Sequence, residues 1–324
     1  MKKVLITGVN GFCGSHLIDF IIDNKFDVDI HGTIRSNSSL HNIEHNLNNI
    51  TLYQCDILDK ALLALLLKEI KPDIVYHFAA QSDVKLSWEK PNETYETNII
   101  GQSNLLEMIR RYAPETVVII TGSSEEFGKI FPVNIPITEL HPLQPVSPYA
   151  VSKVAQDLMS FQHFQNFGTK IIRLRGFNFG GARRPDKFVD SSFTKQYVEI
   201  ELGIRERTII HGNLNAIRDF THIKDACKAY WLAAEKCIPG EVYNVCSGKG
   251  TQIQSIIDKL LLIGSINLET KQDINRMRPS DVPVLIGDNS KFCRITGWKP
   301  ELDITDIIAD TYDYWKEQLQ KKNN

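Results

Sequence analysis

The stretch KKVLITGVNGFCGSHLIDF, Lys2 to Phe20, decides the fold of this chain. A short apolar run, KKVLIT, leads into a loop containing Gly8, Gly11 and Gly14, and a helical pattern follows. Glycines at this spacing allow a tight turn and let the backbone approach a pyrophosphate, which then sits at a helix N-terminus. A glycine loop alone is weak evidence, and an ordinary strand-to-helix turn is the alternative. Here, however, strand, loop and helix occur in the order that a dinucleotide site requires.

The rest of the chain repeats this alternation. Apolar, β-branched runs such as VDIHGTI, DIVYHF, TVVIIT and KIIRL alternate with helical patterns such as LLALLLKEI and IGQSNLLEMIRR. This predicts an α/β fold with a Rossmann-type doubly wound parallel sheet. Later segments, GFNFGGARRPDKFV and RMRPSDVPVLIGD, are rich in Gly, Pro and Arg. They predict a smaller, mixed α/β C-terminal lobe.

The two parts do not meet at a single boundary. We predict a cofactor-binding domain at residues 1–175, with 217–247 returning to it as the helix THIKDACKAYWLAAE and the strand EVYNVCSG. Residues 176–216 and 248–324 then form the substrate-binding lobe.

Composition excludes several classes of protein. The 324 residues carry a formal charge of −2, which gives no electrostatic reason to expect nucleic acid or a lipid surface as a partner. We find no signal peptide and no apolar run long enough to span a membrane. The six cysteines are scattered and the nine histidines show no ligand spacing, so we expect a cytoplasmic protein without a metal.

The end of the second predicted strand indicates the type of cofactor. A site selective for NAD usually has an Asp or Glu about 20 residues after the glycine loop, where it binds the ribose 2′-hydroxyl. This chain has Thr33 there, in HGTIRSNSS, and no acid. Arg35 and Ser36 offer a cation and a hydroxyl, which suit a 2′-phosphate. We therefore predict NADP, the alternative being that Arg35 is a solvated loop cation.

The segment SPYAVSK carries the predicted chemistry. Tyr149 and Lys153 are four residues apart and share one face of a helix. An ammonium beside a phenol favours the phenolate, so Lys153 should lower the pKa of Tyr149 and make it a general base. Ser123, at the end of the TVVIIT strand, should hydrogen-bond the same substrate oxygen. A surface Tyr–Lys pair is the alternative, but the glycine loop argues against it.

With these residues in place, the sequence resembles the extended short-chain dehydrogenase/reductases that act on nucleotide sugars. The matching pieces are TGVNGFCG, CDILD, FAAQSDV, SSEEFG, YAVSK, RDFTHIKDA and GEVYNVCSG. The resemblance implies adenine contacts after the third strand, a cofactor wall after the fourth, and a bracing asparagine, although some of these could be simple core residues. The complete predicted cofactor set is Gly8, Asn10, Gly11, Phe12, Cys13, Gly14, Arg35, Ser36, Asp56, Ile57, Phe78, Ala79, Ala80, Asn98, Tyr149 and Lys153.

Within that family the sequence is most similar to two kinds of enzyme, and its two halves disagree. The segments IRSNSSLHNI and GGARRPDKFV resemble GDP-mannose 4,6-dehydratases, although the first lacks their usual double arginine. The segments RPSDVPVLIGD and TGWKP resemble GDP-6-deoxy-4-ketomannose reductases. The first resemblance implies a lyase, and the second implies an oxidoreductase that consumes NADPH.

Glu125 distinguishes the two activities. By the resemblance, a dehydratase oxidises carbon 4 of the sugar with Tyr149 and NADP, and a carboxylate then removes the proton on carbon 5 while water leaves carbon 6. Glu125 occupies the position of that carboxylate, and Ser123 that of the hydroxyl. Reductases keep a similar SSEEFG segment, so Glu125 could instead be an inherited or sugar-binding residue. We expect Glu126 to be structural or solvent-facing.

The resemblance also implies contacts to the nucleotide diphosphate. Guanidinium groups suit phosphates, and simple surface ion pairs are the alternative for each arginine. Arg183 and Arg184 could bind substrate or contact a neighbouring subunit. The complete predicted substrate set is Ser82, Ser123, Glu125, Asn178, Arg184, Val189, Arg218 and Arg278.

The sequence therefore predicts an NADP-dependent GDP-sugar 4,6-dehydratase with Ser123, Glu125, Tyr149 and Lys153 as its catalytic residues. The GDP-sugar could carry mannose, N-acetylglucosamine or a heptose. An NADPH-dependent 4-ketoreductase is the alternative. The resemblance further implies a homodimer or homotetramer.

Overall fold

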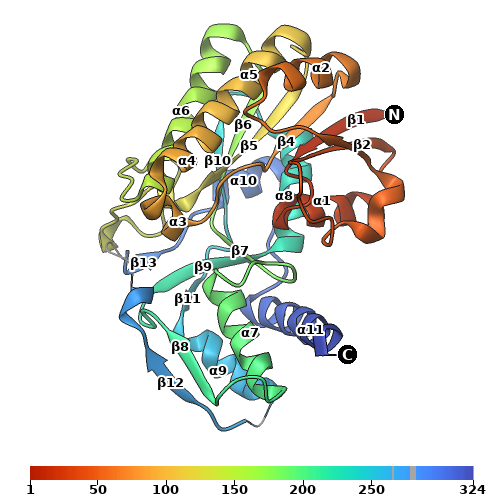
Figure 1. Cartoon of the computed structure of the whole chain (residues 1–324). Coiled ribbons are helices and arrows are strands. Elements are labelled where there is room, and N and C mark those ends of the chain that lie inside the picture. The colour runs from red at the N-terminus through yellow and green to blue at the C-terminus, as the bar shows by residue number, and fades with distance from the viewer. Residues whose placement is uncertain (265, 278–281, 324) are drawn as a thin grey trace.

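A computed structural model describes residues 1–264, 266–277 and 282–323, and it has two lobes of unequal size (Figure 1). The larger lobe contains a seven-stranded sheet in the order β10-β6-β5-β4-β1-β2-β3. All six strand pairs are parallel. This confirms the predicted doubly wound sheet. Its strands are β1 (Lys2–Thr7), β2 (Val28–Ile34), β3 (Thr51–Gln54), β4 (Ile74–His77), β5 (Val117–Ser123), β6 (Ile171–Gly176) and β10 (Val242–Val245).

Helices cover both faces of this sheet, as its continuous apolar strands require. One face packs against α1 (Phe12–Asp23), α8 (Ile223–Lys236) and α10 (Ser290–Thr296). The other packs against α2 (Lys60–Ile70), α5 (Gly101–Tyr112) and α6 (Pro148–Phe167). The short helices α3 (Val84–Glu89) and α4 (Pro91–Tyr95) lie beside α6, and a π-helical turn at Glu96–Ile100 joins α4 to α5.

Local sequence signals fix the helix that carries the predicted tyrosine and lysine. The Ser147 hydroxyl accepts a hydrogen bond from the backbone N–H of Ala150, and Pro148 occupies the first turn of α6. Gly168 ends the helix in a left-handed conformation with φ of 68°. A capped start and a glycine stop are strong helix boundaries, so the first turn of α6 is firmly placed beside the end of β5.

The described part of the smaller lobe contains strands of two to six residues and three α-helices. Strands β7, β9, β11 and β13 form one sheet, and β8 pairs with β12 in a second. Its hydrophobic core is distinct from that of the large lobe. Its elements are β7 (Asn178–Gly180), α7 (Val189–Glu201), β8 (Thr208–His211), β9 (Ile217–His222), β11 (Gly250–Gln252), α9 (Gln254–Ile263), β12 (Glu269–Gln272), β13 (Val284–Leu285) and α11 (Ile304–Asn323).

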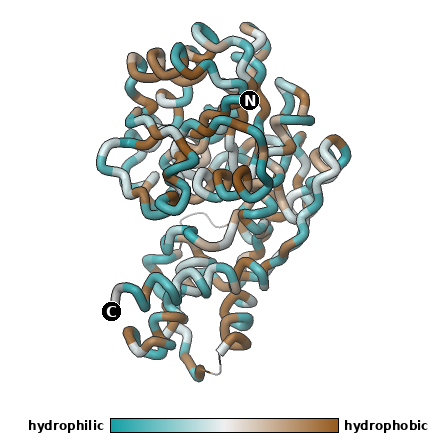
Figure 2. Tube along the Cα trace, turned by 90° about the vertical axis from the view of Figure 1, so that its right-hand side faces the viewer, coloured by the Kyte–Doolittle hydropathy of each residue, from teal (hydrophilic) through white to brown (hydrophobic). Residues whose placement is uncertain are grey.

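The path between the lobes differs in two places from the predicted boundaries. Residues 217–222 form β9 of the smaller sheet, so the return to the large lobe begins with α8. The chain also returns a second time, because Phe292 and Trp298 are fully buried in the core of the large lobe. We had assigned 248–324 wholly to the smaller lobe. Figure 2 shows the two lobes one above the other, with hydrophobic segments in each.

Candidate active site

The glycine loop forms a close-packed cradle at the end of β1. Gly8 adopts φ of 67°, and its N–H donates to the Thr33 carbonyl at 3.1 Å. A Cβ on Gly8 would lie 3.0 Å from the backbone nitrogen of Ala79, and one on Gly14 would lie 2.7 Å from the Gly8 carbonyl oxygen. Within the described residues no side chain caps α1 at Gly11. The first N–H groups of a twelve-residue helix are thus available to a phosphate, and the loop fits a dinucleotide.

Three other predicted cofactor residues lie within this loop and at the start of α1. The Asn10 side chain donates to the Ser39 carbonyl at 2.8 Å. The Phe12 ring lies 5.6 Å from the Arg184 guanidinium carbon. Burial raises the pKa of the Cys13 thiol to about 11, so it is protonated and behaves as a small apolar residue. These positions lie together at the start of α1.

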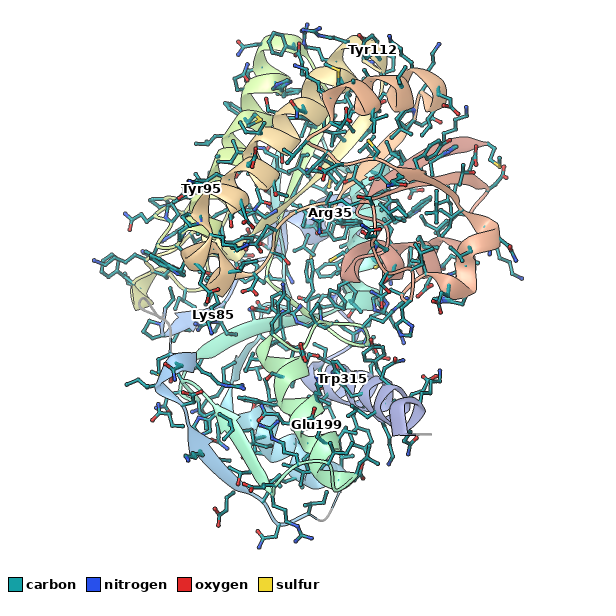
Figure 3. The ribbon with its side chains drawn as sticks, viewed as in Figure 1. Arg35, Lys85, Tyr95, Tyr112, Glu199 and Trp315 are labelled. Atoms are coloured by element: carbon teal, nitrogen blue, oxygen red, sulfur yellow. The ribbon has the colours of Figure 1, made fainter. Side chains whose placement is uncertain are left out.

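Arg35 and Ser36 directly follow β2 and are exposed. Figure 3 places Arg35 in the central part of the molecule, on the side of the large lobe that faces the smaller one. Two asparagines link this segment to the glycine loop: Asn10 through the Ser39 carbonyl, and Asn42 by donating to the Asn10 carbonyl at 3.0 Å. The predicted 2′-phosphate residues therefore adjoin the predicted pyrophosphate loop.

Further predicted cofactor residues follow β3 and β4, and Asn98 lies in the π-helical turn at Glu96–Ile100. Ile57 is buried, and a Cβ on Gly101 would lie 2.5 Å from its Cδ1. Phe78 packs edge-on against the ring of Tyr230, with 4.9 Å between centroids. Asn98 is fully buried and acts on the loop after β4, since it accepts from Gln81 N–H at 2.8 Å and donates to the Gln81 carbonyl at 3.0 Å. Asp56, Ala79 and Ala80 are partly buried at the same edge of the sheet.

Ser123, Tyr149 and Lys153 converge where β5 meets α6. The Ser123 and Tyr149 hydroxyls are hydrogen-bonded to one another. Lys153 Nζ lies 5.9 Å from the centroid of the Tyr149 ring and donates to the Thr121 carbonyl at 2.8 Å. Burial lowers the pKa of Lys153 to about 8. The structure thus brings together the three groups that the sequence placed in one reaction.

The ionisation of Tyr149 differs from the sequence-based expectation. Burial raises its pKa above the ordinary value, and the hydrogen bond to Ser123 only partly opposes this. We had predicted that Lys153 would lower this pKa. Its ammonium is directed to the Thr121 carbonyl, so desolvation of the phenol dominates. Without a further positive charge, Tyr149 is a protonated phenol near neutral pH.

Glu125 and Glu126 lie in a 3₁₀ helix at Ser124–Glu126 and have different surroundings. Glu126 is fully buried, accepts from the Ser123 N–H at 2.7 Å, and accepts from Arg175 Nε at 3.0 Å. It is structural and not solvent-facing. Glu125 is partly buried, and its charge, like that of Glu126, raises the pKa of Tyr149.

The predicted substrate residues divide between the lobes. Asn178 donates to the Asp219 carbonyl at 3.0 Å on neighbouring strands β7 and β9, and Arg218 is the next residue back on β9. Arg184 is buried and pairs with Asp190 at 3.0 Å. Val189 begins α7, and Ser82 is exposed after β4. Arg278 lies outside the described residues.

Arg183, for which we had considered substrate binding or contact with a neighbouring subunit, has several partners within its own chain. It pairs with Asp19 on α1 and donates to the Asn42 carbonyl at 3.0 Å. These contacts direct the Arg183 guanidinium to α1 and to the segment that follows β2.

Sequence reasoning missed two buried polar residues beneath the site. The His77 ring is bonded through Nδ1 to the Thr7 hydroxyl at 2.8 Å, and burial together with the charge of Lys153 lowers its pKa to about 3. Tyr230 on α8 is buried, and burial together with the neighbouring Tyr149 raises its pKa. A histidine at the end of an apolar strand, in DIVYHF, was the available signal for the first.

Three further findings concern the described part of the chain. No cluster of His, Cys, Asp or Glu there could hold a metal ion. None of the helices in the described ranges is both long and apolar enough to cross a membrane. All six cysteines lie in these ranges and are unpaired.

Comparison with known proteins agrees with this geometry. The chain is 27% identical to GDP-6-deoxy-D-mannose reductase of Pseudomonas aeruginosa, with 99% of each chain covered. It is 31% identical to GDP-mannose 4,6 dehydratase 2 of Arabidopsis thaliana, covering 96% of this chain and 86% of the plant protein. The structure of RMD from Pseudomonas aeruginosa complexed with NADPH has a TM-score of 0.85 at 27% identity, covering 98% of this chain and 100% of the other.

A UDP-glucose 4-epimerase of Thermotoga maritima, solved with UDP-glucose, has a TM-score of 0.88 at 27% identity. The match covers 98% of this chain and 99% of the epimerase chain. Residues 5–311 match the protein-family model for GDP-mannose 4,6 dehydratase. The match confirms the resemblance seen in the motifs. The chain therefore belongs to the GDP-mannose 4,6-dehydratase family of extended short-chain dehydrogenase/reductase enzymes.

Proposed function

We propose that this enzyme is an NADP-dependent GDP-sugar 4,6-dehydratase. The observation that carries the proposal is the position of Glu125, a partly buried carboxylate two residues after Ser123 whose charge reaches Tyr149. Ketone reduction needs one proton-transfer group, whereas elimination after oxidation needs a second base near the first. Glu125 and Tyr149 supply that pair.

Burial favours the protonated phenol, so the proposed reaction uses the minor phenolate form of Tyr149. This phenolate takes the proton of the hydroxyl on carbon 4, and Ser123 hydrogen-bonds the same oxygen. When bound, NADP would accept a hydride from carbon 4 and later return it to carbon 6, so it ends the cycle unchanged. The new ketone acidifies carbon 5, and Glu125 removes its proton. The protonated Glu125 gives this proton to the carbon 6 hydroxyl, which leaves as water, and carbon 5 later regains a proton from solvent. The sugar loses one water in total.

The residues at the cofactor end support NADP. The uncapped N-terminus of α1 and the crowded Gly8 fit a pyrophosphate, and Arg35 with Ser36 fit a 2′-phosphate. The solved Pseudomonas RMD carries NADPH. In this proposal Arg218 and Asn178 on the smaller lobe, with Arg184, bind the nucleotide diphosphate and the sugar.

Mass spectrometry tests the proposal directly. The purified enzyme is incubated in D₂O with GDP-mannose, GDP-N-acetylglucosamine and a GDP-heptose, without added cofactor. We expect loss of one water from one sugar over many turnovers, with one deuterium incorporated at carbon 5. Glu125→Gln should abolish both changes because an amide cannot take the proton. Elimination by this variant at the wild-type rate would contradict the mechanism.

A second candidate is an NADPH-dependent reductase of GDP-4-keto-6-deoxy sugars. Two observations favour it: burial keeps Tyr149 protonated, as a proton donor to a ketone must be, and the chain matches the Pseudomonas reductase over 99% of both lengths. Stoichiometric consumption of NADPH on a 4-keto sugar, with no dehydration of any GDP-sugar, would establish this activity in place of the first.

We also propose a homo-oligomer formed through α5 and α6. Val151, Leu158 and Phe161 are exposed on α6, and their spacing puts them on one side of the helix. Exposed apolar side chains in such an arrangement indicate a protein interface. Light scattering after size exclusion should give a dimer or tetramer for the wild type and a smaller species for Leu158→Asp. A monomeric wild type would contradict the proposal.

A further inference from the structure

Arg183 occupies an unusual backbone position between the two lobes. It lies in the turn between β7 and α7 and adopts φ of 63°, a region that residues other than glycine seldom enter. Its side chain is nonetheless only 13% exposed. A buried arginine in a left-handed turn needs surroundings that compensate for its conformation and its charge.

Those surroundings come from α1. Arg183 pairs with the Asp19 carboxylate and donates from Nη2 to His16 Nδ1 at 2.6 Å. His16 in turn donates from Nε2 to the Ala182 carbonyl at 2.8 Å. This arrangement requires a neutral imidazole, and burial together with the Arg183 charge lowers the pKa of His16 to about 3. The turn at 182–183 is thereby fixed to the first helix of the large lobe.

The same guanidinium also holds the segment that follows β2. Its Nη1 donates to the Asn42 carbonyl at 3.0 Å. The Asp19 carboxylate that pairs with Arg183 also accepts from His45 at 2.8 Å and from Asn46 at 2.7 Å. Residues 42–46 are therefore bound to Arg183 directly and through Asp19.

Residues 35–46, which we call the phosphate segment, begin with Arg35 and Ser36. The phosphate segment also contacts the glycine loop. The Asn42 side chain donates to the Asn10 carbonyl at 3.0 Å, and the Asn10 side chain donates to the Ser39 carbonyl at 2.8 Å. The phosphate segment thus lies between the glycine loop and Arg183. Arg35 itself is exposed at its start, so its position depends on how the rest of the segment is held.

We propose that Arg183 is a positioning residue for recognition of the cofactor's 2′-phosphate, acting through the phosphate segment from the opposite lobe. This inference rests on the NADP preference proposed above. Arg183 does not touch the cofactor in this account. It holds Asn42 and Asp19, and this keeps Arg35 and Ser36 in a fixed position relative to the glycine loop.

Cofactor binding by isothermal titration calorimetry of the full-length chain tests this role without measuring activity. Arg183→Gln should weaken NADPH binding about tenfold, which corresponds to one hydrogen bond to a charged group, and should change NADH binding less than about twofold. Arg205→Gln is the matched control, because Arg205 is paired with Glu199 at 3.0 Å in the same lobe but away from the segment. It should change neither affinity.

A double-variant cycle then separates positioning from general damage. If Arg183 acts through Arg35, the variant carrying both Arg35→Gln and Arg183→Gln should bind NADPH as weakly as Arg35→Gln alone. Equal weakening of NADPH and NADH by Arg183→Gln would overturn the inference. So would a loss in Arg35→Gln with none in Arg183→Gln, which would leave the proposed NADP preference intact. Equal wild-type affinity for both cofactors would overturn both proposals.

Hydrogen exchange provides a second readout if Arg183→Gln folds poorly. Asp19→Asn keeps the shape of the partner while removing its charge. We expect faster amide exchange across residues 36–46 in this variant, with NADPH affinity reduced and NADH affinity kept. Unchanged exchange and unchanged NADPH affinity would contradict the role of the Arg183–Asp19 pair.

Discussion

Two pairs of neighbouring like charges, Glu125–Glu126 and Arg183–Arg184, belong to the two ends of the predicted site, the reacting end and the cofactor loop, and their surroundings differ. In the acidic pair, Glu126 is buried against Arg175 while Glu125 remains partly buried beside Tyr149. In the basic pair both side chains have acidic partners, Asp19 and Asp190. In the acidic pair, one residue is therefore structural and the other lies in the proposed reacting centre. In the basic pair, Arg183 joins the two lobes through Asp19, whereas Arg184 pairs with Asp190 within the smaller lobe.

The largest expected effect is that of Tyr149→Phe on turnover, and it tests whether the reaction takes place at Tyr149, next to Glu125. Tyr149→Phe should lower kcat about 1,000-fold, because it removes the proton-transfer group while keeping the ring. Turnover of the sugar nucleotide measures this, and NADPH affinity together with the thermal midpoint serves as the control. A variant that keeps a tenth of the wild-type rate would move the chemistry away from Tyr149 and make its proximity to Glu125 incidental.

A stability measurement sharpens the contrast within the acidic pair. Glu126→Ala should lower the free energy of unfolding by about 3 kcal/mol, because it leaves the buried Arg175 with one carboxylate fewer and the Ser123 N–H without its acceptor. Glu125→Ala should cost less, since that side chain is only partly buried. Urea denaturation of both variants gives the comparison. A larger loss for Glu125→Ala would reverse the assignment of structural and chemical roles.

The sequence predicted the sheet and the pairing of Tyr149 with Lys153 from short-range signals, and it placed Ser123 beside them because Ser123 ends a parallel strand. The strand and helix periods, the glycine spacing and the four-residue step along α6 are all local. The surroundings of each charge are not. The partners of Arg183 lie 141 to 167 residues away, and the pKa of Tyr149 depends on burial by elements from several parts of the chain. Likewise, only the fold reveals that β9 joins the smaller sheet and that Trp298 returns to the larger core.

The smallest expected effect is a tenfold change in kcat/KM per pH unit. It distinguishes the dehydratase from the reductase through the ionisation of Tyr149 and Lys153. Lys153 has a pKa of about 8, and burial places that of Tyr149 higher. If Tyr149 acts as a base in carbon 4 oxidation, kcat/KM should rise tenfold per unit below pH 8, as phenolate accumulates. It should level off above pH 8, where loss of the Lys153 charge offsets the gain.

If Tyr149 instead donates a proton to a ketone, both groups are in their active forms below pH 8, so kcat/KM should be level there. It should then fall tenfold per unit above pH 8 as Lys153 loses its proton. Lys153→Arg keeps its charge throughout and should remove the break in either profile. A profile without a break near pH 8 in the wild type would exclude Lys153 as the group that supports Tyr149. A break of the first kind would favour the dehydratase, because only then does the enzyme begin its cycle with Tyr149 as a base beside Glu125.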